Sequence, residues 1–182
     1  MLIFISGGVR SGKSTLGEKI ANKIAHENKV YLATSKVYDE EMRARINKHQ
    51  KDRQSKGFIT IEKSEDIGEI ISQLRKTDTV MMDCLGTLVA NEMFKDYTKT
   101  INESDIPVFI EKIFSDIINV SKSVSNMIVI SNEIFSDGKI YDDATEKYIQ
   151  VIGGLHIKIA AASDQAIECI YGHNIVHKGE KL

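Results

Sequence analysis

The segment from Gly7 to Ser14, which reads GGVRSGKS, constrains the fold more than any other part of the chain. It matches the spacing GxxxxGK[ST] in full, directly after the apolar run from Leu2 to Ile5 and directly before a stretch with helical periodicity. Glycines let the backbone turn so that successive amide groups converge on phosphate oxygens at a helix N-terminus. The segment therefore predicts a strand, a phosphate-binding loop and a helix, and with them a bound nucleoside triphosphate.

Two residues of this loop carry predicted chemistry. Lys13 supplies a positive charge for the β and γ phosphates and is a candidate catalytic residue, while the Ser14 hydroxyl is placed to bind Mg²⁺. The complete set of predicted loop residues is Gly7, Gly8, Val9, Arg10, Ser11, Gly12, Lys13 and Ser14.

A second metal ligand is predicted at the end of another apolar run. Thr79 to Met82 reads as a buried strand, and Asp83 follows it, which is where P-loop proteins hold their metal-side carboxylate. Aspartate is also a good helix cap, so a cap for a helix around residues 86–94 is the alternative role for Asp83. The two roles are compatible, and both stay open at this point.

Apolar periodicity alternates along the chain between short runs and helical stripes, which predicts strands alternating with helices. Most of the predicted strands are apolar on both faces, as in sheets covered by helices on both sides. The expected fold is a single doubly wound, mostly parallel α/β domain over residues 1–182. The expected strands are 2–6, 30–34, 58–62, 79–85, 127–131 and 166–171. The expected helices cover 13–27, 105–123 and 142–163, with Pro107 in the first turn of the second and a bend at Gly153-Gly154 in the third. A further helix is expected after Ser64, which caps it; its apolar stripe is Ile67, Ile70, Ile71 and Leu74.

Composition narrows the classes of partner. The chain has 182 residues, 42% of them hydrophobic, which is enough to build a core of its own. Its 24 basic and 26 acidic side chains leave a net charge of −2, which argues against broad attraction to nucleic acid or anionic membrane.

The apolar runs are too short for a membrane span or a signal peptide. Cys84 and Cys169 are expected to be buried thiols, and the protein is expected to be cytoplasmic.

Residues 39–53 read as a charged helix that carries a candidate nucleophile. Met42, Ile46 and His49 recur at helical spacing, so the only apolar stripe of this segment ends in a histidine. An imidazole that is largely neutral at pH 7 is a competent nucleophile toward phosphorus when cations lie nearby. An ordinary surface histidine on a solvated helix fits the same residues, so both interpretations stay open on composition alone.

Several motifs in order resemble one family. They are GGVRSGKS at the loop, LATS at 32–35, DEEMRARINKH ending at His49, TIE at 60–62, MMDCLGTLVAN at 81–91 and IVISNEI at 128–134. This order resembles the bifunctional adenosylcobinamide kinase / adenosylcobinamide-phosphate guanylyltransferase family of cobalamin biosynthesis, collinear over nearly the whole chain. The resemblance implies a RecA-like P-loop fold, a homotrimer, a corrinoid substrate, Mg²⁺, and ATP and GTP as nucleotide substrates.

The resemblance also implies roles for individual residues. It makes His49 the histidine that takes GMP from GTP and passes it to the phosphorylated substrate. Ala33, Thr34 and Ser35 match a segment that contacts the nucleotide, and Gln50, Lys51, Asp52 and Arg53 match a stretch lying along it. Glu62 and Asp83 match two acids that the family uses around guanine or metal.

The chain departs from the family in three places. Gln50 and Gln54 stand where the family has a basic residue and a proline, residues 135–140 carry one glycine and no proline, and His156-Ile157 replaces an Asn-Gln pair. Two other functions therefore remain as alternatives, both with a working P-loop. One is a small-molecule kinase that has lost guanylyl transfer, and the other is a nucleotide-dependent binding or regulatory protein.

Overall fold

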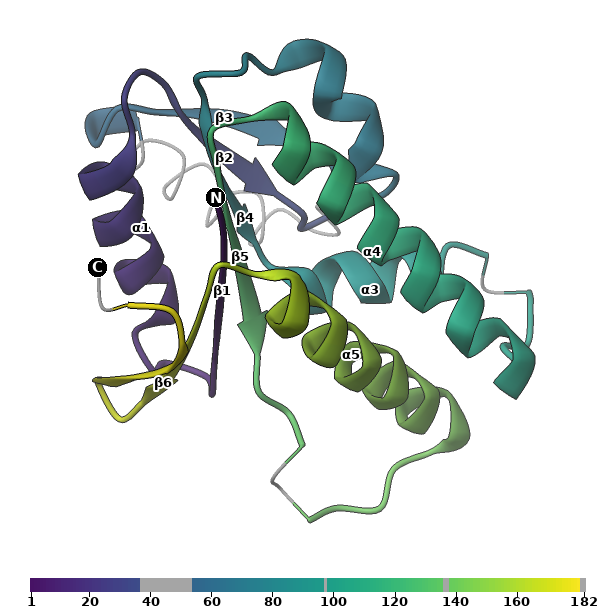
Figure 1. Ribbon diagram of the computed structural model, residues 1–182. Coiled ribbons are helices and arrows are strands. Elements are labelled where there is room, and N and C mark those ends of the chain that lie inside the picture. The colour runs from purple at the N-terminus through teal and green to yellow at the C-terminus, as the bar shows by residue number, and fades with distance from the viewer. Residues whose placement is uncertain (37–53, 97, 136–137, 181–182) are drawn as a thin grey trace.

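A computed structural model describes residues 1–36, 54–96, 98–135 and 138–180 (Figure 1). Strands and helices alternate along the chain, as the periodicity predicts. The strands are β1 (Leu2–Gly7), β2 (Lys29–Ala33), β3 (Phe58–Glu62), β4 (Thr79–Asp83), β5 (Asn126–Asn132), β6 (Gln165–Ile170) and β7 (His173–Lys178). The α-helices are α1 (Lys13–Ile24), α3 (Leu85–Met93), α4 (Ile106–Ser123) and α5 (Asp143–Ala162), and the 3₁₀ helices are η1 (Ile67–Gln73) and η2 (Glu103–Asp105).

Within the described ranges, the strands form one seven-stranded sheet in the order β3-β2-β4-β5-β1-β6-β7. Strands β1 to β6 pair in parallel, and β7 runs antiparallel to β6 at one edge. The predicted α/β class with a mostly parallel sheet is confirmed. The edge strand β7 was not predicted, because its residues HNIVHK are mostly exposed and lack a clear alternation of apolar and polar side chains.

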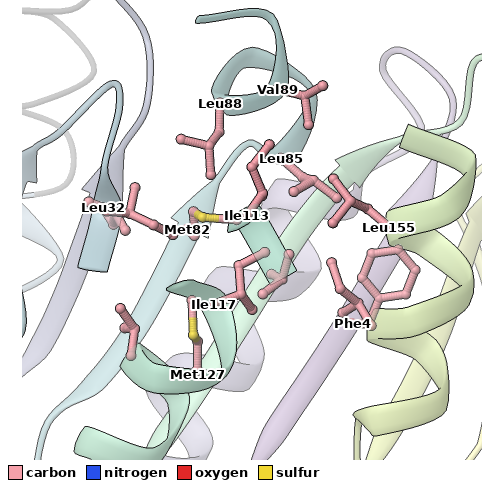
Figure 2. Packing of buried hydrophobic residues seen from close by; sticks show 14 of the residues in the cluster. Phe4, Leu32, Met82, Leu85, Leu88, Val89, Ile113, Ile117, Met127 and Leu155 are labelled. Atoms are coloured by element: carbon pink, nitrogen blue, oxygen red, sulfur yellow. The ribbon is translucent and has the colours of Figure 1, made fainter. Parts of the chain in front are cut away.

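Helices cover both faces of the sheet, which makes it doubly wound (Figure 1). Among the α-helices that the structure describes, α1 lies on one face, and α3, α4 and α5 lie on the other. The face under α3, α4 and α5 holds the larger apolar cluster (Figure 2). Side chains from four strands and all three helices meet in it, among them Phe4, Leu32, Met82, Leu85, Leu88, Ile113, Ile117, Met127 and Leu155. The pair Met81-Met82 fills the core on opposite faces, as expected for structural methionines.

Helix α1 approaches the sheet closely through a glycine. A Cβ atom built on Gly17 would lie 2.9 Å from Ile130 Cδ1 and 3.0 Å from Met81 Cε, so a larger residue has no room. Both contacts come from the central strands β4 and β5. The first turn of α1 is thereby held over the carboxyl end of β4.

The segment after β3 differs from the prediction. An α-helix capped by Ser64 was expected, but residues 67–73 form the 3₁₀ helix η1, with Asp66 as its N-cap. Its buried residues Ile67 and Ile70 are three apart, which is the period of a 3₁₀ helix. The start is fixed by tertiary structure, because the amide of Asp66 donates to the Glu92 carboxylate of α3 at 2.7 Å.

Two long helices follow the prediction closely. Helix α4 begins at Ile106 with Pro107 in its first turn, and α5 runs without interruption through Gly153 and Gly154. A Cβ atom on Gly154 would lie 2.5 Å from Ile110 Cδ1 of α4. Gly154, in the pair where a bend was expected, thus lies at a close contact between α4 and α5.

The predicted helix over residues 39–53 lies outside the described residues. Among the helices that the structure does describe, none has both the length and the apolar character of a membrane span.

Candidate functional site

The predicted phosphate-binding loop joins β1 to α1 at the carboxyl edge of the sheet. Gly12 is the N-cap of α1 and has φ 97°, and Arg10 also has a positive φ of 59°. A Cβ atom on Gly7 would lie 2.5 Å from the carbonyl oxygen of Cys169 and 2.6 Å from Ser11 Oγ. The glycines therefore allow a tight turn whose amides precede a helix N-terminus, which is the arrangement that binds phosphate.

Two side chains of the loop are arranged to receive an anion. Lys13 is 8% exposed, and its ammonium folds back to donate to the carbonyl oxygen of Gly8 at 2.9 Å. Ser11 Oγ is buried and has no hydrogen-bond partner among the described atoms. A buried hydroxyl without a partner is costly, and phosphate oxygens bound in the loop would accept hydrogen bonds from such groups.

The packing of α1 places Ser14 and Asp83 on the same face of the sheet, toward its carboxyl edge. Gly17 contacts Met81, and Ser14 lies one turn before Gly17, about 4.5 Å nearer the carboxyl edge of the sheet. Asp83 follows Met81 by two residues on the same face of β4, about 6.6 Å nearer that edge. Ser14 thus lies over the end of β4, on the face where Asp83 points. A hydroxyl and a carboxylate are oxygen ligands of the kind that Mg²⁺ prefers, so these residues fit the predicted metal.

Asp83 has a partner of its own in Tyr31 of β2. The phenol hydroxyl donates to Asp83 Oδ2 at 2.8 Å. The alternative prediction for Asp83, a cap on the next helix, is wrong, because α3 has Cys84 as N-cap and no side-chain cap bond. In the described part of the chain, no group of three or more His, Cys, Asp or Glu side chains is placed to hold a metal ion. Further ligands to Mg²⁺ here would be phosphate oxygens and water.

The segment Ala33 to Ser35 leaves the sheet beside Asp83. Thr34 is fully buried, and its Oγ1 donates to the carbonyl oxygen of Cys84 and accepts from the Cys84 amide, both at 2.9 Å. Asn91 of α3 donates its side-chain amide to the carbonyl oxygen of Thr34 at 2.7 Å. These bonds hold the segment in register with the end of β4.

The remaining predicted site residues fall into two groups. Glu62 is exposed at the end of the edge strand β3, opposite Ala33 in the strand pairing. It therefore lies at the same carboxyl edge as Asp83, with β2 between their strands. His49, Gln50, Lys51, Asp52 and Arg53 lie outside the described residues.

A family model described as cobinamide kinase / cobinamide phosphate guanyltransferase matches residues 3–176. The chain belongs to this family. Membership makes it a transferase of cobalamin biosynthesis and confirms the resemblance read from its motifs.

The curated relatives align with this chain over nearly their whole length, and their sequence identity to it is modest. The bifunctional adenosylcobalamin biosynthesis protein CobU of Escherichia coli (strain K12) is 28% identical over 91% of this chain and 93% of its own. CobU of Salmonella typhimurium (strain LT2) is 27% identical over the same shares. The bifunctional protein CobP of Pseudomonas aeruginosa (strain PAO1) is 25% identical over 98% of both chains.

Two solved structures are similar to this chain at low identity. The flagellar accessory protein FlaH from Methanocaldococcus jannaschii has a TM-score of 0.47 and 17% identity, over 98% of this chain and 78% of FlaH. A second solved structure, of an ATPase domain, has a TM-score of 0.49 and 15% identity, over 92% of this chain and 68% of that domain. The fold class given above rests on the sheet itself.

In this member of the cobinamide kinase family, residues beyond the predicted set also lie at the loop. Asn132 of β5 pairs with Gly7, and the amide of Glu133 donates to the carbonyl oxygen of Gly7 at 2.9 Å. Sequence reasoning left them and Tyr31 out of the site. The sequence does contain a signal for Asn132 and Glu133: they are two polar residues at the end of a buried strand. When such a strand lies next to the strand that enters the phosphate loop, its last residues meet the loop.

Two of the segments that depart from the family's usual residues meet in the structure. The rings of Phe135 and His156 pack edge to face, 5.3 Å apart. His156 Nε2 is 2.7 Å from Ser131 Oγ of β5, and burial lowers the pKa of this histidine to about 4, against a smaller opposing effect of Glu133. The packing of His156 between these groups fits a structural role. The two departures thus form one contact between α5 and the segment after β5.

Proposed function

We propose that this protein phosphorylates the aminopropanol hydroxyl of adenosylcobinamide and then transfers GMP to the product. The observation that carries the proposal is the family match over residues 3–176 in a chain whose GxxxxGK[ST] loop joins β1 to the N-terminus of α1. The two reactions share one class of chemistry, attack of an oxygen or nitrogen nucleophile on a nucleotide phosphorus.

The first step is phosphoryl transfer. The substrate hydroxyl attacks the γ-phosphorus of a nucleoside triphosphate, the bond to the bridging oxygen breaks, and the hydroxyl proton is lost as the nucleoside diphosphate leaves. The loop amides and Lys13 hold the phosphates, and Ser14 with Asp83 would hold Mg²⁺. The metal, when bound, offsets charge on the phosphate oxygens.

The second step is guanylyl transfer through His49. A ring nitrogen attacks the α-phosphorus of GTP, the bond to the β-phosphate oxygen breaks, and pyrophosphate leaves. A phosphate oxygen of the phosphorylated substrate then attacks the same phosphorus, breaks the phosphorus–nitrogen bond, and gives adenosylcobinamide-GDP. Gln50, Lys51, Asp52 and Arg53 follow His49, and the guanidinium of Arg53 has the geometry to bind phosphate oxygens.

Two further groups belong to the same proposed site. Ala33, Thr34 and Ser35 contact the nucleotide, held by the bonds from Cys84 and Asn91. Glu62, exposed at the same edge of the sheet, is the acid proposed to bind the guanine base. A carboxylate suits this base because guanine presents two neighbouring N–H donors.

The proposal extends to assembly and location. We expect a cytoplasmic homotrimer in which residues 1–182 form one domain in each subunit. Light scattering coupled to size exclusion tests the assembly: a mass three times that of the chain supports it, and a monomer or dimer contradicts it.

Product analysis tests the two activities directly. The protein is mixed with adenosylcobinamide, Mg²⁺ and either ATP or GTP, and products are identified by mass spectrometry. Adenosylcobinamide-GDP is expected with GTP. Phosphorylated adenosylcobinamide without GMP transfer would indicate a monofunctional kinase. Slow hydrolysis that cobinamide does not change would indicate a nucleotide-dependent binding protein and would contradict the proposal.

A labelling experiment tests His49. Incubation with α-labelled GTP is expected to give an acid-labile label on the wild-type protein and on the control His26→Ala, which changes an exposed histidine of the loop after α1. His49→Ala is expected to carry no label. Equal labelling of His49→Ala and wild type would remove His49 from the mechanism.

A further inference from the structure

Tyr31 links β2 to the end of β4 through a directed hydrogen bond. Tyr31 is opposite Met81 in the strand pairing, yet its hydroxyl reaches the residue two positions farther along and donates to Asp83 Oδ2 at 2.8 Å. Side chains in this diagonal relation on one face of a sheet are within reach of a long aromatic residue. The ring therefore lies on the same face of the sheet as α1, beside the proposed metal site.

Packing fixes the ring of Tyr31 independently of Asp83. Tyr31 is 4% exposed, and its ring meets that of Phe58 edge to face with centroids 6.4 Å apart. The ammonium group of Lys29 lies over the Phe58 ring, 5.0 Å from its centroid, and completes the cluster. A ring held in this way sets the position of its hydroxyl, so the hydroxyl orients the carboxylate.

The Asp83 carboxylate needs such a partner. It is half-buried, it does not cap α3, and its free rotation about two side-chain bonds would place its oxygens in several directions. A hydrogen bond to Oδ2 selects one rotamer and leaves Oδ1 for another ligand. Partners of this kind, which bind the ligand and not the metal, commonly contribute 10- to 100-fold in metal affinity.

We infer that Tyr31 is a positioning residue of the metal site: its hydroxyl holds Asp83 in the orientation that binds Mg²⁺ beside Ser14. This inference rests on the proposed role of Asp83 as a metal ligand. It assigns Tyr31 no contact with substrate or nucleotide.

The test compares Tyr31→Phe with Tyr148→Phe. Both changes remove one phenol hydroxyl from a residue that is not exposed, and the Tyr148 hydroxyl donates to the carbonyl oxygen of Gly86 on the opposite face of the sheet. Each protein is saturated with α,β-methylene GTP and titrated with Mn²⁺, whose free concentration is read by electron paramagnetic resonance. Tyr31→Phe is expected to bind Mn²⁺ about tenfold more weakly, and Tyr148→Phe to match wild type within about twofold.

Activity gives a second reading. Tyr31→Phe is expected to need about tenfold more Mg²⁺ for half-maximal product formation, with kcat at saturating Mg²⁺ near the wild-type value. A loss of kcat that added Mg²⁺ does not restore would contradict a positioning role. Unchanged Mn²⁺ affinity in Tyr31→Phe would overturn the inference while leaving the proposed function intact.

A double-mutant cycle shows whether Tyr31 acts through Asp83. Asp83→Asn is expected to weaken Mn²⁺ binding, and Tyr31→Phe in that background to add less than a twofold further change. A full tenfold effect of Tyr31→Phe without the carboxylate would overturn the inference. Wild-type Mn²⁺ affinity in Asp83→Asn would instead remove Asp83 from the metal site, and with it the basis of the inference.

Discussion

The two faces of the sheet differ in what covers them and in what they carry. Among the described α-helices, α3, α4 and α5 lie with the larger apolar cluster on one face, whereas α1 lies on the other (Figure 1). The face under α1 holds Lys13 and Ser14 of the phosphate loop, together with Asp83 and its partner Tyr31. The larger cluster contributes packing, and the proposed phosphate and metal chemistry belongs to the face that α1 covers.

This difference has a physical origin. The N-terminus of a helix binds phosphate through its backbone amides. The absence of a side chain at Gly17 lets α1, which begins at the phosphate loop, lie directly on Met81 and Ile130 of the sheet. Helices α3, α4 and α5 meet the opposite face through large aliphatic side chains (Figure 2). Changes on the two faces should therefore separate activity from stability, and the following predictions test that separation.

The largest effect is expected from Lys13→Ala. Both activities should fall by roughly 100- to 1,000-fold or more, because the change removes the cation that the loop places beside the phosphates. The control is Lys19→Ala, which removes an exposed lysine of the same helix and should leave both rates near wild type. Near-wild-type phosphorylation of adenosylcobinamide by Lys13→Ala would contradict the assignment.

A change in the larger cluster should act on stability instead. Ile117→Ala removes a fully buried side chain of α4 and is expected to lower the free energy of unfolding by about 2–5 kcal/mol. The rate per folded molecule should stay near wild type. Ile157→Ala, at a position 74% exposed on α5, should change the free energy of unfolding by less than about 0.5 kcal/mol. Denaturant unfolding measures both, and a loss of rate in folded Ile117→Ala would break the separation.

The pH dependence of stability should also come from the face under α3, α4 and α5. Burial lowers the pKa of His156 to about 4 from its usual 6.5, so between these values the unfolded chain binds a proton that the folded protein does not. Stability should therefore decline as the pH falls from about 6.5 to 4, by roughly 3 kcal/mol from this group. His156→Gln, which keeps a hydrogen-bonding group beside Ser131, should lack this part of the decline. Identical pH profiles for the two proteins would refute the prediction.

The smallest effect is expected at the start of α5. The Asp142 carboxylate accepts hydrogen bonds from the amides of Ala144 and Thr145, and these bonds lower its pKa. Asp142→Ala should lower Tm by roughly 2–4 °C, since it removes a helix cap. Asp142→Asn should keep the cap and most of the Tm, and equal losses in the two variants would show that the carboxylate charge, and not its capping hydrogen bonds, stabilises the helix. Neither change should alter nucleotide binding on the α1 face.

Most of the fold is predictable from local sequence. The loop from Gly7 to Ser14 fixes one strand and one helix, and long apolar periods locate α4 and α5 to within a residue or two. The errors lie where tertiary contacts decide: Glu92 sets the start of η1, and β7 is specified by pairing with β6 more than by its own residues. A bend was expected at Gly153-Gly154 of α5, because the contact of Gly154 with Ile110 of another helix is not visible in the sequence.

The candidate site was only partly predictable for a related reason. Motif spacing identifies candidate residues for binding phosphate and metal, such as Lys13 and Asp83. It does not identify the residues that hold them, because Tyr31 reaches Asp83 across two strands whose pairing no local pattern specifies. Asn91 is similar, since its bond to the carbonyl oxygen of Thr34 joins parts of the chain far apart in sequence.

A crystal structure of the protein with Mg²⁺ and α,β-methylene GTP tests the central claim most directly. The account predicts the triphosphate in the loop from Gly7 to Ser14, with the metal held by Ser14 Oγ and by Asp83, directly or through one water, while Tyr31 still bonds to Asp83. A metal held elsewhere, with the Asp83 carboxylate turned away from the phosphates, would contradict the account.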